Sequence, residues 1–198
     1  MHFQHGHFRA TQPETPSPTA FPVHRVRVRE ELNIAYIAQG DGYPILLLHG
    51  WPETKRIWWR NIVPLVQAGY RVIVPDLRGF GDSDVSPDDR HDITEYALDC
   101  HDLMTRVLGH DHYSIAAGDV GGVVAVDMAL RFDTHVDRLC FFNSVPPFLG
   151  NAYTEQGLDE AGLRGDATGD YRQWQGHRPG DLIQELDTTV RRRRWVAD

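Results

Sequence analysis

The fold of this chain is decided by one stretch, Tyr113-Ser114-Ile115-Ala116-Ala117-Gly118-Asp119-Val120-Gly121-Gly122-Val123-Val124-Ala125-Val126. Its first five residues form a short apolar run typical of a buried parallel strand, and residues 123–130 have the pattern of an apolar-faced helix. Small residues on both sides of Asp119, among them Gly118, Gly121 and Gly122, let the chain turn sharply from strand to helix. Such a turn places the Asp119 side chain above the sheet, at the N-terminus of a helix.

Two interpretations of Asp119 follow from this stretch. The geometry is that of a nucleophile elbow, with a carboxylate where a serine is usual. The positive end of the helix favours an ionised carboxylate, which can attack an electrophilic carbon. In the other interpretation, Asp119 is an ordinary N-cap of the helix. The stretch by itself does not decide between them.

Length, composition and charge limit the classes of protein to which the chain can belong. A chain of 198 residues with 41% hydrophobic and 24% charged residues is typical of one globular domain with a large core. The formal net charge of −8 argues against binding to nucleic acid or to an acidic membrane. No apolar run has transmembrane or signal-peptide character, so we expect a cytoplasmic protein. Cys100 and Cys140 are predicted to be buried free thiols.

The organisation along the chain has three parts. Residues 1–22 hold His2, His5 and His7, but no cysteine or carboxylate cluster accompanies them, so we expect a mobile tail and no metal site. Residues 23–144 alternate strand and helix patterns and are predicted to form the core. Residues 145–198 change to loops and short helices.

The predicted core begins with an antiparallel strand pair and continues as alternating strands and helices. The strands are expected at residues 23–28, 32–38, 44–48, 71–75, 113–117 and 136–142, and the helices at residues 56–68, 93–108 and 123–130. Pro64 must lie in the first turn of its helix or break it. The alternation predicts an α/β fold, a mostly parallel sheet with helices on both faces. Functional loops then follow the strand ends, where His49, Asp76 and Asp119 fall.

These motifs resemble a known family. The segments that carry the resemblance are His49-Gly50-Trp51-Pro52, Asp76-Leu77-Arg78-Gly79-Phe80-Gly81-Asp82-Ser83 and the elbow around Asp119. In this order, at strand ends, they resemble the α/β-hydrolase fold, and within it the epoxide hydrolase and dehalogenase branch. The resemblance covers residues 23–144, and departs from the family at Ala117 and Gly118, where Gly-His is usual.

The resemblance implies a role for each loop residue. The backbone N–H groups of Trp51 and Val120 are expected to form an oxyanion hole beside Asp119. Trp51–Pro52 favours a cis peptide that aims the first of these groups. We expect His49, Gly50 and Pro52 to support this loop rather than to act as a base. For Asp76 and Arg78, a buried ion pair or a brace of their loop is expected rather than chemistry.

The chain lacks sequence motifs that are typical of other hydrolases and of nucleotide-binding proteins. No serine lies in a Gly-x-Ser-x-Gly motif, and the glycines near Asp119 do not form Gly-x-Gly-x-x-Gly, so neither a serine hydrolase nor a nucleotide cofactor is expected. Haloacetate dehalogenases place arginines just after the nucleophile, where this chain has Val120 and Val123. Haloalkane dehalogenases usually have Trp at the position of Val120. Both differences favour epoxide opening, although Trp174 keeps dehalogenation as an alternative.

Residues 145–198 are expected to be a partial helical cap, since this branch inserts a cap here. Epoxide hydrolases carry cap tyrosines that polarise the epoxide oxygen, and Tyr171 resembles the first of these. A neutral phenol can donate a hydrogen bond and then a proton to the alkoxide that develops. The alternative is a tyrosine packed on the cap surface, and Tyr153 is a second candidate. The expected substrate is a small apolar electrophile.

One part of the catalytic apparatus of the resembled branch has no counterpart here. Hydrolysis of an alkyl ester on Asp119 needs a histidine base and its acid partner, which in this branch follow the cap, beyond Asp198. We therefore expect a C-terminally truncated enzyme that is inactive in turnover. A non-catalytic, hydrolase-like module is the alternative. The strand at residues 136–142 is then an exposed edge, through which oligomers or aggregates can form.

Overall fold

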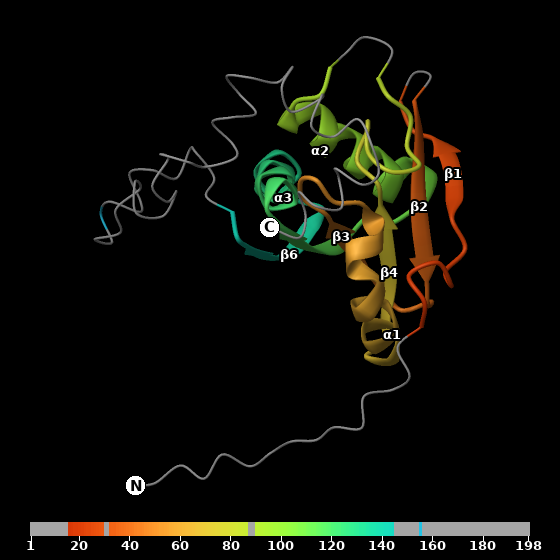
Figure 1. The fold of residues 1–198 in the computed structure, drawn as a ribbon. Helices are drawn as coiled ribbons and strands as arrows, with labels where there is room; N and C mark the ends of the chain where they lie inside the picture. The colour runs from red at the N-terminus through yellow and green to blue at the C-terminus, as the bar shows by residue number, and fades with distance from the viewer. Residues whose placement is uncertain (1–15, 30–31, 87–89, 145–154, 156–198) are drawn as a thin grey trace, which may run out of the picture. The chain divides into compact units, whose positions relative to one another are not determined.

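The computed structural model describes residues 16–29, 32–86, 90–144 and residue 155 (Figure 1). The chain divides into two compact units, residues 1–144 and residues 145–198. The elements below all belong to the first unit. The cap predicted for residues 145–198, with Tyr153, Tyr171 and Trp174, lies outside the described residues and stays a prediction.

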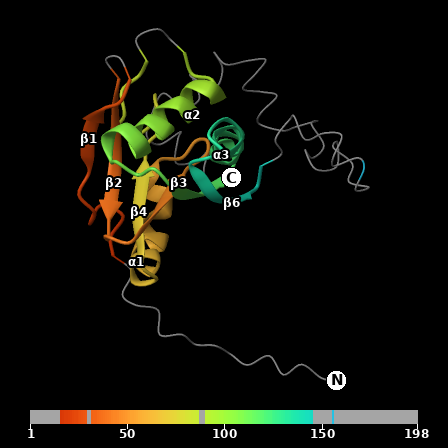
Figure 2. The ribbon, with the colours of Figure 1, turned by 180° about the vertical axis from the view of Figure 1, so that it is seen from behind.

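The described residues form one six-stranded sheet, in the order β1-β2-β4-β3-β5-β6. The strands are β1 (His24–Arg27), β2 (Asn33–Gln39), β3 (Tyr43–Leu48), β4 (Tyr70–Pro75), β5 (Tyr113–Gly118) and β6 (Val136–Phe142). The first pair is antiparallel, as is β2 with β4, and the strands β4, β3, β5 and β6 run parallel. Figure 2 shows β1 and β6 at opposite ends of the sheet. The mostly parallel α/β fold is thus confirmed.

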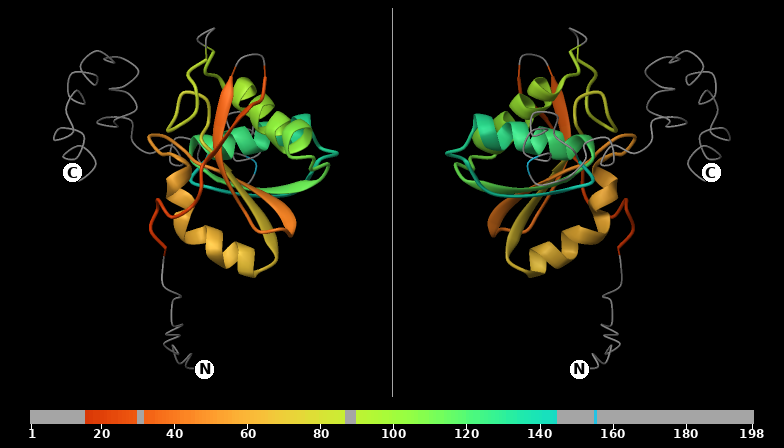
Figure 3. Two further views of the ribbon diagram at one scale, coloured as in Figure 1. Left: turned by 90° about the vertical axis from the view of Figure 1, so that its right-hand side faces the viewer. Right: turned by 90° about the vertical axis from the view of Figure 1, so that its left-hand side faces the viewer.

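Helices cover both faces of this sheet. On β3, Ile45 and Leu47 pack in a cluster with Ile62 of α1 (Trp59–Gln67), while Leu46 and Leu48 pack in a cluster with residues of α2 (Ile93–Asp102) and α3 (Val120–Arg131). Figure 3 shows α1 on one side of the sheet and α2 and α3 on the other. Burial on both faces explains why the strand reads as an unbroken apolar run. Each such buried side chain stabilises the fold by roughly 1.5–3 kcal/mol.

Two helix predictions need correction. The helix expected at residues 56–68 is a 3₁₀ turn, η1 (Lys55–Trp58), followed by α1, and Pro64 lies inside α1 without ending it. The carbonyl of Pro64 still accepts the Ala68 N–H at 3.0 Å, so the proline removes only the bond that its own nitrogen would donate. The helix expected at residues 93–108 is α2 followed by a π turn, η2 (Leu103–Val107).

Two further expectations fail in part. The predicted tail is anchored over its last residues, because Phe21 packs against the cluster of α1 and Arg56 donates a hydrogen bond of 3.0 Å to the Pro18 carbonyl. Residues 1–15, with the three histidines, lie outside the described residues. Cys100 is buried as predicted, but Cys140 is exposed. It lies on β6 at the end of the sheet, where the described residues leave its face uncovered. None of the helices in the described ranges is long and apolar enough to cross a membrane.

Candidate active site

Three loops meet at the carboxyl end of the parallel strands. His49 directly follows β3, Asp76 follows β4 and Asp119 follows β5. Because β3 pairs with β5 up to Leu48 and Ala117, the loops that leave these two strands emerge side by side. The tertiary structure thus brings together the motifs that the sequence places at strand ends.

Asp119 has the geometry of an elbow. Its backbone has φ 53° and ψ −127°, a left-handed conformation that side chains rarely adopt. It stands at the N-cap position of α3, yet its side chain makes no capping hydrogen bond. Instead, Oδ1 accepts the backbone N–H of Trp51 at 2.9 Å. The Asp119 carbonyl accepts from the Gly122 N–H at 3.0 Å and from the Ser144 hydroxyl at 2.7 Å, which fixes the strained residue.

The predicted supporting glycines allow close packing around this turn. A Cβ on Gly50 would lie 2.7 Å from Asp119 Oδ1, and one on Gly121 would lie 2.8 Å from the Leu48 carbonyl oxygen. On Gly118 it would meet the Phe142 ring at 2.7 Å, and on Gly122 it would meet the Ser144 Cβ at the same distance. Real Cβ atoms do not approach other atoms so closely, and therefore a side chain at any of these positions would force the atoms that face it to shift.

His49 is buried, and both of its ring nitrogens are engaged. The Leu77 N–H donates to Nε2 at 3.0 Å, so the proton is on Nδ1, which donates to the Gly50 carbonyl at 2.8 Å. Burial holds the pKa of His49 below its usual value, which keeps the ring neutral. The histidine therefore ties the loop after β3 to the loop after β4, and has no free lone pair with which to act as a base.

The loop that carries Trp51 is braced from within. The Trp51–Pro52 peptide is cis, as the sequence predicts. The Glu53 carboxylate accepts the Gly50 N–H at 2.8 Å, and the Glu53 N–H donates to the Gly50 carbonyl at 3.2 Å. Sequence reasoning missed Glu53. Val120 is the first residue of α3, directly after Asp119, and the role of its N–H stays a prediction.

Asp76 and Arg78 do make buried ion pairs, each with its own partner. The Asp76 carboxylate pairs with the ammonium of Lys55, which the sequence analysis did not single out. The Arg78 guanidinium holds Asp99 by two bonds of 2.6 and 2.7 Å and lies 3.1 Å from Glu95. The signal for Arg78 was present in the sequence, since two carboxylates four residues apart fall on one face of α2.

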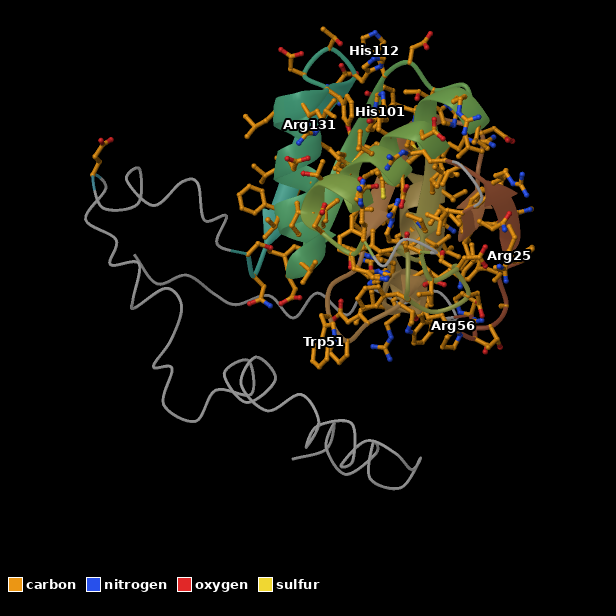
Figure 4. All side chains as sticks on the ribbon, turned by 90° about the horizontal axis from the view of Figure 1, so that it is seen from above. Arg25, Trp51, Arg56, His101, His112 and Arg131 are labelled. Carbon is orange, nitrogen blue, oxygen red and sulfur yellow. The ribbon has the colours of Figure 1, made fainter. Side chains whose placement is uncertain are left out.

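His101 and His112 lie away from this site. Figure 4 shows His101 and His112 at the opposite side of the first unit from Trp51. His101 stacks on Phe132 with ring centroids 3.6 Å apart, and its Nδ1 shares a hydrogen bond of 3.0 Å with the Tyr113 hydroxyl. Across the described ranges, no three His, Cys, Asp or Glu side chains are grouped to hold a metal ion.

A scan against family models matches residues 43–197 to the alpha/beta hydrolase fold. The chain belongs to the α/β hydrolase-fold family. Among curated relatives of this α/β hydrolase, a soluble epoxide hydrolase of Corynebacterium sp. (strain C12) is 39% identical over 113 residues, which are 56% of this chain and 38% of the relative. A bifunctional epoxide hydrolase 2 of Sus scrofa is 29% identical over 92% of this chain and 33% of the relative.

Solved structures agree with these relatives. The epoxide hydrolase VrEH1 from Vigna radiata matches with a TM-score of 0.59 and 26% identity, over 69% of this chain and 44% of the other. The α/β hydrolase described here thus spans between about a third and a half of the length of these proteins. Its relatives place it in the epoxide hydrolase-like branch of the family, as the motifs predict.

Proposed function

We propose that this chain carries the nucleophile of an epoxide hydrolase-type enzyme, with Asp119 attacking an epoxide carbon to give an alkyl-enzyme ester. One observation carries the proposal. Asp119 stands where an N-cap would stand but does not cap its helix, and its carboxylate instead accepts the Trp51 N–H at 2.9 Å. A residue held in a strained conformation, aimed at a backbone donor 68 positions away, suits a nucleophile better than a cap.

The two carboxylate oxygens have different tasks in this proposal. Oδ1 is held by Trp51, and Oδ2 attacks the less hindered carbon of a small apolar epoxide. A carbon–oxygen bond forms, the ring bond to oxygen breaks, and the alkoxide takes a proton from a donor for which Tyr171 is the candidate. During hydrolysis of the ester, the negative charge develops on Oδ1, where the N–H of Trp51, together with that of Val120, would stabilise it.

Hydrolysis of the ester needs a general base, which typically contributes ~10²–10⁴-fold in rate. His49, which directly follows β3, has both of its ring nitrogens already bonded. We therefore expect that the purified 198-residue chain forms the ester much faster than it releases it. The product would be a stoichiometric adduct on Asp119 and no sustained turnover.

The test is intact-protein mass spectrometry after incubation with styrene oxide, an apolar terminal epoxide. A mass increase of one substrate, located on Asp119 by peptide mapping, is expected, and Asp119→Asn should not show it. Asp127→Asn is a matched control, because this carboxylate lies on the exposed side of α3, paired with Arg131. An adduct at other carboxylates with Asp119 unmodified would refute the nucleophile.

A second arm separates epoxide opening from its rivals. The alkyl bromide 2-phenylethyl bromide has the same carbon skeleton as styrene oxide. Its leaving group is a bromide ion, which needs no proton donor. Faster ester formation from the bromide than from the epoxide would favour a dehalogenase-like enzyme. No adduct from either reagent would favour a non-catalytic, hydrolase-like module.

A further inference from the structure

Lys55 is a buried charge that the proposed mechanism does not use. It is the first residue of η1, and only 1% of its side chain is exposed. Its ammonium forms ion pairs with two carboxylates, that of Asp76, which is fully buried, and that of Asp82 at 2.6 Å, which is half-exposed. The desolvation of an ammonium costs several kcal/mol in a protein interior unless partners surround it. Burying a lysine here therefore costs more desolvation free energy than burying an apolar side chain of the same volume.

The network around Lys55 joins two loops. The Lys55 backbone N–H donates to Asp76 Oδ1 at 2.7 Å, so main chain and side chain of the same residue hold the two oxygens of one carboxylate. Asp76 also accepts the Asp82 N–H at 2.7 Å. A Cβ on Gly81, whose φ is +52°, would overlap the Asp76 carboxylate, so the loop after β4 is wrapped tightly around it. The loop after β3 is thus fastened to the loop after β4 at Lys55.

His49 fastens the same two loops at the other end of this segment. Its ring accepts the Leu77 N–H and donates to the Gly50 carbonyl. Residues 50–54 therefore lie between two residues, His49 and Lys55, that are both bonded to the loop after β4. Trp51 lies inside this segment, and its N–H is the group that reaches Asp119. Five residues between two fixed points have little freedom, and a shift of either point would turn the Trp51 N–H away from its acceptor.

We propose that Lys55 is a positioning residue, whose ion pair with Asp76 fixes the loop that aims the Trp51 N–H at Asp119. An apolar side chain could fill the same volume, but it could not fix a carboxylate at two points. The inference rests on the proposed function for its effect on rate, whereas the aim of the Trp51 N–H can be measured without any reaction.

The first measurement is the backbone amide signal of Trp51 in ¹⁵N–¹H spectra, with its hydrogen-exchange rate. Asp119→Ala removes the acceptor and gives the signal of the unbonded N–H. Lys55→Met keeps most of the side-chain length and removes the charge. We expect its Trp51 signal to move toward that of Asp119→Ala, with exchange at least ~10-fold faster than in the wild type because the bond opens more often.

Ile62→Ala is the control for lost stability, because this fully buried residue of α1 belongs to the apolar cluster of Ile45 and Leu47, which includes no residue of the Trp51 loop. It should lower the free energy of unfolding without moving the Trp51 signal. If Lys55→Met does not fold, Lys55→Met/Asp76→Leu removes both charges and keeps the volume apolar. This double variant should fold and still lose the Trp51–Asp119 bond.

The second measurement is the rate of adduct formation on Asp119 with styrene oxide. In Lys55→Met, or in the double variant, it should fall by at least ~10-fold, since a misplacement of about 1 Å near the reacting groups can cost up to 10²-fold. A Trp51 signal and exchange rate unchanged from the wild type would overturn the role of Lys55. Absence of an adduct in the wild type would instead overturn the proposed function, and leave the spectra to decide on Lys55.

Discussion

The backbone N–H of Trp51 donates a hydrogen bond of 2.9 Å to Oδ1 of Asp119, which lies 68 positions further along the chain. This bond joins the loop after β3 to the elbow after β5. It gives the carboxylate a fixed orientation, so the proposed reaction would not need to reorganise it. It should also make the site sensitive to small changes in either loop.

Gly50→Ala should separate the two loops. The new Cβ would lie 2.7 Å from Asp119 Oδ1 and must push the carboxylate or the Trp51 loop aside. We expect adduct formation with styrene oxide to fall at least ~10-fold, and the free energy of unfolding to fall by about 1–3 kcal/mol, as for other overpacked sites. Gly69→Ala is the matched control, because no atom lies within 4 Å of its Cβ and its φ of +89° costs ~1–2 kcal/mol of stability away from the site. Equal rates in the two variants would contradict the prediction.

The backbone strain at Asp119 should be measurable as a lower free energy of unfolding. Its φ of 53° with ψ of −127° suits glycine and is unfavourable for any residue with a Cβ. Asp119→Gly and Asp119→Ala both remove the carboxylate, but only the first removes the strain. We expect the glycine variant to be more stable than the alanine variant by about 1 kcal/mol in urea unfolding, since the higher entropy of unfolded glycine offsets part of the gain. An alanine variant as stable as the glycine variant would show that the elbow is relaxed.

Acid should destabilise the fold through histidines that are buried or partly buried. Burial holds the pKa values of His49, His101 and His110 below their ordinary value. Between that value, about 6.5, and the lower pKa of the folded state, the unfolded chain binds protons that the folded chain does not. The free energy of unfolding is therefore highest above about pH 6.5 and falls with pH below it, by at most ~1.4 kcal/mol per pH unit for each group.

His49→Asn tests the share of one residue in this pH dependence. Asparagine keeps a donor and an acceptor but cannot titrate, so the variant should lose less stability than the wild type as the pH falls from neutral toward 5. Urea unfolding of both proteins across this range gives the comparison. If both curves have the same slope, the pKa of His49 in the folded state is not lowered.

The outer edge of β6 should promote self-association. Within the described residues β6 pairs with β5 alone, Cys140 is exposed and Phe142 is 55% exposed. Unpaired N–H and C=O groups beside apolar side chains favour pairing with another chain. Cys140→Lys should lower the average mass seen in sedimentation experiments at high concentration. Leu130→Lys, which changes an exposed apolar residue on α3, should leave the average mass unchanged. Equal effects of both substitutions would indicate nonspecific hydrophobic association rather than pairing of the β6 edge.

Much of the fold could be predicted because its signals are local. The apolar run Tyr43–Leu48 is buried on both faces and belongs to a parallel strand, as its pattern indicates. Prediction failed where the burial or the conformation of a residue depends on its tertiary surroundings. Cys140 has the pattern of a buried strand residue, but burial depends on what covers the strand. Pro64 remains inside α1 because the helix needs to give up only one hydrogen bond there.

The sequence by itself determined the strand, the turn and the helix around Asp119, and the positions of the two other loops at strand ends. These follow from side-chain volume and periodicity over a few residues. Only the tertiary structure decided between cap and elbow, because the partner of the carboxylate, Trp51, comes from a different loop. It alone also showed Lys55 as a buried charge, since a lysine in a polar loop becomes buried only when the loop of Asp76 and Asp82 closes around it. Hydrogen bonds and ion pairs between distant segments depend on the path of the whole chain, and no local pattern encodes them.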